Sequence, residues 1–429
     1  MKHFLSLAFF LSILFPGGSA FAISPLHTGS VPTDGRAAPK LVPSPEGISA
    51  KDAAAGPAPF SAPSPTEALA PPQVGTPKLM EVYGFFLPVA HYASGAIGSF
   101  GRPNMSAPTE AVLNGRSRGT FQVQQSRFGA NFMVSSEVRA KLEVDFIDFS
   151  KASPSVQALP RLRILKIEYE LAPAVILFAG QDWDIFSPLN AYGYNFVGGQ
   201  FRGGNAGFMR LQAGAAAKFL GAVEAAGSLG FGNPNALEND QAQETEKQPV
   251  FSARVAYAKG PWRAGISGIY SRYGYYTNGP SNPIRTTVTT PEAYAGNLFA
   301  EGAFAGIEFR GEAYHGQNLA NINLLTVGLG TPELPRVKES GAYLSAKYKW
   351  NKASFWTTLG FASIQDFERV NSATKGSSGL SRNKVFKFGA DYGLGEKLRA
   401  FYELSLFRTT YFNGEAREGL HSVGLYLPI

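Results

Sequence analysis

The stretch VRAKLEVDF, residues 138–146, alternates strictly between apolar and charged side chains. One face carries Val138, Ala140, Leu142, Val144 and Phe146, and the other carries Arg139, Lys141, Glu143 and Asp145. A period of two is the period of a β-strand, in which successive side chains point to opposite faces. A strand with one apolar face and one charged face suits the wall of a barrel that stands between lipid and water.

The same alternation recurs throughout the chain after residue 80 and predicts sixteen antiparallel strands. We expect them near residues 80–93, 119–134, 137–149, 161–172, 174–183, 206–217, 218–231, 249–259, 261–272, 292–304, 305–316, 339–350, 353–364, 383–393, 396–408 and 417–429. An even number of amphipathic strands is typical of an all-β, antiparallel transmembrane β-barrel.

The connections between these strands alternate between short and long. Residues 135–136, 259–261 and 351–352 are tight turns, whereas residues 231–248 and 272–293 are long polar stretches. This alternation is the asymmetry of an outer-membrane barrel, which has short periplasmic turns and long external loops. A soluble β-sandwich has no reason to keep it.

The N-terminal part of the chain has a different character. Residues 1–22 combine Lys2, an apolar core and the sequence Ala20-Phe21-Ala22, which together predict a cleaved signal peptide. Residues 23–80 are rich in proline and alanine and show no periodicity, so we expect a disordered periplasmic tail. A peptidoglycan tether is the functional alternative for this tail. Residues 81–429 are expected to form the barrel.

The composition of the chain excludes several kinds of site and activity. The chain has no cysteine, which excludes disulfides, cysteine-ligated metals and a thiol nucleophile. Its mean hydropathy of -0.08 excludes a bundle of transmembrane helices but not a barrel of alternating strands. The net charge of +7 includes no run of lysine or arginine, so nucleic-acid binding is not indicated. The five histidines lack metal-binding spacing, and we expect no metal, no cofactor and no enzymatic activity.

Four segments resemble the Gram-negative DcaP-like trimeric porins. They are QQSRFGANF (124–132), KLEVDF (141–146), PRLRILKIEYE (160–170) and, most of all, LFAGQDWDIFSPLNA (177–191). The terminal Ile429 departs from the aromatic residue that usually ends such chains. The resemblance implies a multi-pass outer-membrane barrel, a homotrimer and a water-filled channel. Sixteen strands also enclose a lumen too wide for wall side chains to fill, which favours a channel on geometric grounds.

Residues 182–205 follow the fifth expected strand and are more aromatic and apolar than the other long loops. The resemblance implies that this segment folds inward as a constriction loop, with Asp182 and Asp184 among its acids. A plain external loop is the alternative. Because side chains alternate between the two faces of a strand, we expect a set of basic residues on the lumenal face of the wall opposite the constriction loop. These bases are Arg127, Arg139, Lys141, Arg161, Arg163 and Arg210.

The expected pore lining also includes Glu143, Lys166 and Glu168. Acids facing bases across a narrow aqueous gap would create a field that orients solutes and selects the sign of ions. The sequence equally allows Arg139 and Lys141 to pair with Glu143 and Glu168 within the wall.

We expect passive diffusion of small hydrophilic solutes with a weak preference for anions and small carboxylates. An outer-membrane barrel hydrolase and a structural envelope protein are the alternatives. A plugged receptor is disfavoured, because residues 23–80 are too rich in proline to form a folded plug.

Overall fold

The structure is a computed structural model. It describes residues 79–94, 117–147, 159–195, 200, 202–231, 248–272, 275–276, 287–289, 292–319, 336–365, 380–411 and 414–429. The expected signal peptide, nearly all of the expected tail and most of the long loops lie outside these residues. Within them, no helix is long and apolar enough to cross a membrane.

The described strands account for nearly all of the expected ones. They are β1 (Met80–Phe86), β2 (Val89–Ala93), β3 (Arg118–Gln122), β4 (Arg127–Met133), β5 (Val138–Asp145), β6 (Arg161–Ala172), β7 (Val175–Trp183), β8 (Met209–Phe219), β9 (Val223–Gly230), β10 (Gln248–Lys259), β11 (Trp262–Arg272), β12 (Tyr275–Tyr276), β13 (Thr287–Thr289), β14 (Glu292–Phe304), β15 (Ile307–Gln317), β16 (Lys338–Trp350), β17 (Ala353–Ile364), β18 (Leu380–Gly393), β19 (Arg399–Tyr411) and β20 (Gly414–Pro428). The short strands β12 and β13 pair only with each other, and the other eighteen form one sheet.

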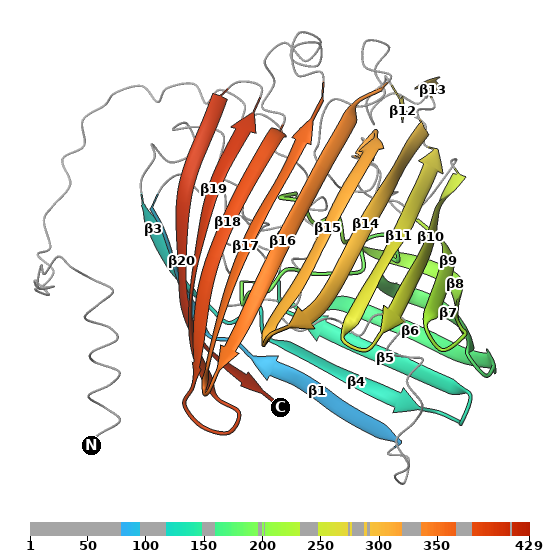
Figure 1. The fold of residues 1–429 in the computed structure, drawn as a ribbon, viewed down its shortest axis with the longest axis horizontal. Helices are drawn as coiled ribbons and strands as arrows, with labels where there is room; N and C mark the ends of the chain where they lie inside the picture. Colours follow the sequence, from blue (N-terminus) through green and yellow to red (C-terminus); the bar gives the residue numbers. More distant parts are fainter. Residues whose placement is uncertain are drawn as a thin grey trace, which may run out of the picture. The chain divides into compact units, whose positions relative to one another are not determined.

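Two of the wall strands are interrupted. β1 and β2 are successive parts of one strand, broken at residues 87–88, and β3 and β4 are parts of the next, broken at residues 123–126. At the first break, the backbone N–H of Leu87 donates to Ser126 Oγ at 3.0 Å. Counted this way, the wall has the sixteen antiparallel strands expected. β1 and β2 both pair with β20, which closes the barrel (Figure 1).

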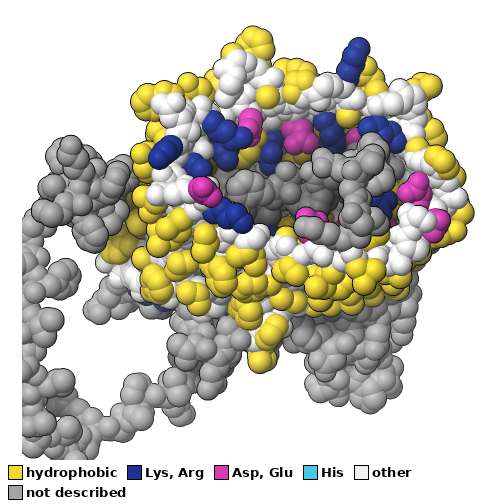
Figure 2. Space-filling view, turned by 90° about the horizontal axis from the view of Figure 1, so that it is seen from below, with side chains coloured by type: hydrophobic (Ala, Val, Ile, Leu, Met, Phe, Trp, Pro, Cys, Tyr) yellow, Lys and Arg dark blue, Asp and Glu magenta, His cyan; other side chains and the backbone are white. Residues whose placement is uncertain are grey.

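The wall has an apolar outside and a polar inside. Figure 2 shows hydrophobic side chains around the outer rim, with Lys, Arg, Asp and Glu side chains around the hollowed interior. Outward side chains such as Ile266 and Leu344 are 59% and 58% exposed, whereas the inward Arg310 and Glu312 are buried. Such an apolar belt is stable when lipid surrounds it.

The connections differ from expectation in one place. β19 ends at Tyr411 and β20 begins at Gly414, and these two residues are register partners. The last external connection is therefore short, whereas the sequence indicated a gap over residues 409–416. The alternation of short and long connections holds for the other strand pairs that the structure describes.

A bulge in β6 changes which face its residues occupy. Glu143 lies opposite Ile164, but the next residue of β5, Val144, lies opposite Leu162. Arg163 is therefore an extra residue without a partner position on β5, and the alternation of faces reverses across it.

This reversal lets the odd-numbered Arg161 and the even-numbered Lys166 share the lumenal face. Gln181 of β7 stabilises the bulge from the outward face, because its Nε2 donates to the carbonyls of Leu162 at 2.8 Å and Arg163 at 2.9 Å. The hydrocarbon core of a membrane contains no water that could donate hydrogen bonds to these carbonyls. The side-chain amide of Gln181 donates them instead.

Candidate functional site in the barrel lumen

The segment that follows β7 folds into the barrel. Within residues 184–208, the described part passes inside the wall between the front and back strands (Figure 1). Ile185 and Phe186 are 1% and 0% exposed, and Phe186 packs with wall residues such as Ile269 of β11. The inward fold expected of residues 182–205 is confirmed. Its start is shifted, because β7 continues to Trp183.

The second half of the loop packs against the far side of the barrel. The Tyr194 ring stacks on Phe401 of β19 with ring centroids 4.4 Å apart and meets Trp356 of β17 edge-on. Tyr192 belongs to the same cluster. Leu189 packs in a separate buried cluster that includes wall residues of β10, β14 and β16. The loop is therefore a packed layer over the β10–β20 side of the lumen.

Two lumenal carboxylates hold the backbone of this loop. Glu312 of β15 accepts hydrogen bonds from the backbone N–H of Leu189 at 2.9 Å and from Ser187 Oγ. Glu403 of β19 accepts one from the backbone N–H of Tyr194 at 3.0 Å. These hydrogen bonds supply partners for backbone N–H groups that are buried in the lumen, so they fix the position of the loop against the wall.

Two tyrosine hydroxyls add contacts nearer the short turns. Tyr192 Oη donates to Glu308 at 3.3 Å, and Tyr194 Oη donates to Asp391 at 3.1 Å. Burial raises the pKa of Tyr192 to about 12 and also raises the pKa of Tyr194. Both hydroxyls therefore keep their protons at neutral pH and remain donors.

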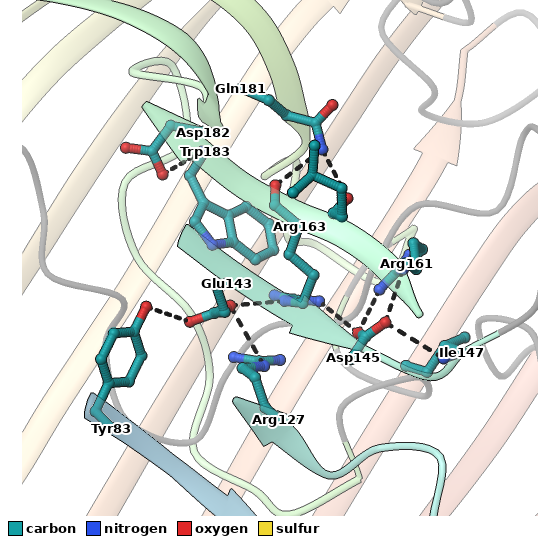
Figure 3. Close-up of polar contacts among 11 residues, drawn as sticks. Tyr83, Arg127, Glu143, Asp145, Ile147, Arg161, Arg163, Gln181, Asp182 and Trp183 are labelled. Atoms are coloured by element: carbon teal, nitrogen blue, oxygen red, sulfur yellow. Dashed lines mark hydrogen bonds and ion pairs between the residues drawn. The ribbon is translucent and has the colours of Figure 1, made fainter. Parts of the chain in front are cut away.

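The wall formed by β4, β5, β6 and β7 carries a network of ion pairs (Figure 3). Arg163, which is 0% exposed, donates to Glu143 at 2.7 Å and to Asp145 at 3.1 Å. Arg161 also binds Asp145, at 2.6 Å, and Arg127 lies 3.4 Å from Glu143. Three arginines thus share two carboxylates, which leaves a local excess of positive charge.

Further ion pairs extend the network along β6 and β7. Lys166 lies 2.8 Å from Glu168 and 2.6 Å from Asp182. At the periplasmic end, Arg139 lies 3.9 Å from Glu170. Neighbouring strands present these charges at several heights, so the β4–β7 wall is charged along much of its length.

The expected pore-lining residues therefore come together on one wall, but their partners differ from those expected. Asp184 binds Arg210 at 3.1 Å, and Asp182 binds Lys166. These two acids pair directly with bases beside them and do not face a basic wall across a gap, because a buried charge is stable only next to its counter-charge. Lys141 lies over the Tyr83 ring, with Nζ 5.2 Å from the ring centroid.

Sequence reasoning missed several residues of this site. Asp145, Glu312 and Glu403 each belong to a strand whose charged face was recognised, but nothing local marked them as partners of an arginine cluster or of a loop. Tyr83 Oη donates to Glu143 at 3.2 Å and was likewise not anticipated. Within the described residues, no group of three or more His, Asp or Glu side chains is arranged to hold a metal ion.

Solved structures with a similar fold are outer-membrane proteins. The outer membrane channel DcaP of Acinetobacter baumannii matches with a TM-score of 0.61 at 14% sequence identity, covering 82% of this chain and 97% of that one. The fold is that of a DcaP-like outer-membrane porin. No protein-family model matches the sequence, and no curated protein matches it significantly.

Two other porins share this fold at lower similarity. The anion-selective porin from Comamonas acidovorans matches with a TM-score of 0.53 at 10% identity, covering 82% of this chain and 99% of that one. Salmonella typhi OmpF, solved in complex with daunomycin, matches with a TM-score of 0.53 at 9% identity, covering 82% and 97%. Proteins with this porin fold are multi-pass barrels of the outer membrane. At such identities the lumenal chemistry must be argued from this chain's own residues.

Proposed function

We propose that this chain is an outer-membrane porin through which small hydrophilic solutes diffuse passively, with a weak preference for anions and small carboxylates. The observation that carries the proposal is the barrel with an inward loop packed on one side and a charged wall on the other. The loop covers the β10–β20 side, so the aqueous path runs along β4–β8. No cofactor and no chemical step is needed.

Buried guanidinium nitrogens that lack hydrogen-bond partners among the described residues support the preference for anions. Arg254 of β10 is 3% exposed and forms no ion pair with any described residue, and its Nη1 lacks a hydrogen-bond partner there. Arg210 Nη1 and Nη2 and Arg163 Nη2 also lack partners among the described residues. Buried donors without partners call for a water or an anion. A lumen with surplus N–H donors would raise the local concentration of anions.

Reversal potentials in a salt gradient across a planar bilayer test this preference. We expect the wild-type channel to favour chloride over potassium, and Arg210→Gln on β8 to lower the permeability ratio by roughly twofold. Arg272→Gln is the matched control, because Arg272 lies on the outward face of β11 opposite Glu292. A wild-type channel that clearly prefers potassium would contradict the proposed selectivity, and a protein that never conducts would contradict the channel itself.

The remaining features of the chain are part of the same proposal. Residues 1–22 would direct export and be removed, and residues 23–80 would form a periplasmic tail that contacts peptidoglycan. The barrel, residues 81–429, would assemble as a homotrimer. One structure that matches this fold, the Vibrio cholerae outer-membrane protein OmpT in vitro folded, is described as a trimer form, with a TM-score of 0.51 at 12% identity.

A further inference from the structure

Three basic side chains lie in one row on the outward face of the barrel. Lys384 of β18 is the register partner of Arg408 of β19, and Arg408 is the partner of Arg417 of β20. All three are exposed, and the alternate residues of these strands point inward. The row lies near the ends of β18, β19 and β20 that are remote from the short turns, at the top of Figure 1.

This row retains excess positive charge. Glu415 lies 2.9 Å from Arg408 and 3.0 Å from Arg417, and Lys384 forms no ion pair with any described residue. One carboxylate thus pairs with two of the three cations, although like charges directly opposite one another destabilise a sheet. Elsewhere on the outward face the arrangement is different, because Arg272 of β11 lies opposite Glu292 of β14.

An apolar row lies directly beneath the basic one. Leu359 of β17, Phe386 of β18, Leu406 of β19 and Gly419 of β20 are successive register partners, two residues nearer the short turns. Leu359, Phe386 and Leu406 are 59%, 37% and 43% exposed. The outward surface therefore changes from apolar to basic within two residues along each strand.

A groove joins the two rows. It has a volume of about 1200 Å³, and its outward lining combines the three bases with apolar and small side chains. These apolar and small residues are Ala313, Ala342, Leu344, Leu359, Phe361, Phe386, Leu406 and Gly419. The groove opens on the outward side of the wall, because the intervening lining residues are buried on the inward side. These residues are Glu312, Tyr343, Val385, Phe407 and Glu418.

We propose that this groove binds a phosphorylated glycolipid of the outer leaflet, of the lipid A class. Its phosphates would contact Lys384, Arg408 and Arg417, and an acyl chain would lie along Leu359 and Phe386. This inference rests on the outer-membrane setting of the proposed function, in which the ends of the strands remote from the short turns face the outside. A basic cluster bordering an apolar surface is the arrangement that recognises anionic lipid headgroups.

The spacing of the bases favours a glycolipid that carries two phosphates. Three neighbouring strands spread the three charges over about 10 Å, since adjacent strands lie about 4.8 Å apart. Two phosphates on one rigid disaccharide can span such a row, whereas the single phosphate of a glycerophospholipid can neutralise only part of it. Charge complementarity therefore selects the doubly phosphorylated lipid.

Native mass spectrometry of the full-length barrel in detergent, with added bisphosphorylated lipid A, tests the proposal. We expect the wild-type protein to retain lipid A and the triple variant Lys384→Gln, Arg408→Gln, Arg417→Gln to bind it at least about tenfold more weakly. Glu415→Gln should bind more tightly, because it removes the competing carboxylate. Arg272→Gln is the matched control and should bind like the wild type.

Further variants and a second lipid distinguish a specific lipid A site from general electrostatic attraction of anionic lipids. The charge-conserving variant Lys384→Arg, Arg408→Lys, Arg417→Lys should keep most of the binding, and heat-modifiable gel mobility checks that every variant is folded. Equal retention by the wild type and the folded triple variant would overturn the proposal. Equal binding of phosphatidylglycerol and lipid A by the wild type would overturn it too. Conductance measured in bilayers without lipid A tests the porin function separately, so either proposal can fail without the other.

Discussion

Arg163 shows how a single residue organises the charged wall. It is the extra residue of the bulge in β6, and its guanidinium joins Glu143 of β5 to Asp145 two positions along the same strand. All three side chains are almost completely shielded from solvent. Removing Arg163 would leave Glu143 and Asp145 with one arginine each, Arg127 at 3.4 Å and Arg161 at 2.6 Å. Both carboxylates would lose the buried, charge-assisted hydrogen bond that Arg163 donates.

We therefore predict that Arg163→Met destabilises the barrel by about 3 kcal/mol, because two carboxylates lose a shared buried partner. Urea unfolding in lipid vesicles, followed by tryptophan fluorescence, measures the change. Lys349→Met is the matched control: Lys349 lies 2.5 Å from Glu308, but its side chain is 59% exposed. An exposed pair contributes less than about 1 kcal/mol, so similar losses in both variants would contradict this account.

At the scale of elements, the inward loop depends on the wall for its position. Its backbone N–H groups bind Glu312 and Glu403, which come from strands far along the chain. A loop buried in a lumen needs partners for its backbone groups, and these carboxylates supply them. The loop would then partly occlude the lumen for as long as both contacts hold.

We expect the double variant Glu312→Ala, Glu403→Ala to release the loop and raise the single-channel conductance, roughly twofold, with added current noise. Single-channel recording in planar bilayers measures both quantities. Glu301→Ala is the control, since Glu301 contacts Arg263 at 3.3 Å and has no described contact with the loop. Unchanged conductance in a folded double variant would show that Glu312 and Glu403 are not the contacts that hold the loop in place.

At the scale of the whole molecule, the barrel is closed by pairing its first and last strands. β20 pairs with β19 on one side and with β1 and β2 on the other. Closure leaves none of the eighteen described strands of the wall with a free edge, so copies of the barrel cannot associate by pairing these strands. An assembly of three barrels would therefore contain three separate lumens.

From this we predict that channels close in three equal conductance steps at high voltage. Planar-bilayer recording of protein purified without denaturation measures the steps, and multi-angle light scattering on the same sample gives the mass of the assembly. Single-step closure together with the mass of one barrel would rule out the homotrimer and leave the channel function intact.

Much of this architecture follows from sequence because it depends on local patterns. The alternation in VRAKLEVDF requires only neighbouring residues, and the same holds for the strand positions and for the apolar content of residues 182–205. The partners of Asp182 and Asp184 could not be foreseen in the same way. Asp182 meets Lys166 across the pairing of β6 with β7, and no local signal marks the register of that pairing.

The sequence by itself determined the number of strands and the two faces of the wall, since both are consequences of period-two alternation. The inward loop was expected from the resemblance to DcaP-like porins, supported by the apolar content of residues 182–205. Only the tertiary structure decided that Arg163 joins Glu143 to Asp145, that Glu312 and Glu403 hold the loop, and that Lys384, Arg408 and Arg417 form one row. The physical reason is that these contacts join residues far apart in the chain, and register, bulges and closure of the sheet determine which of them meet.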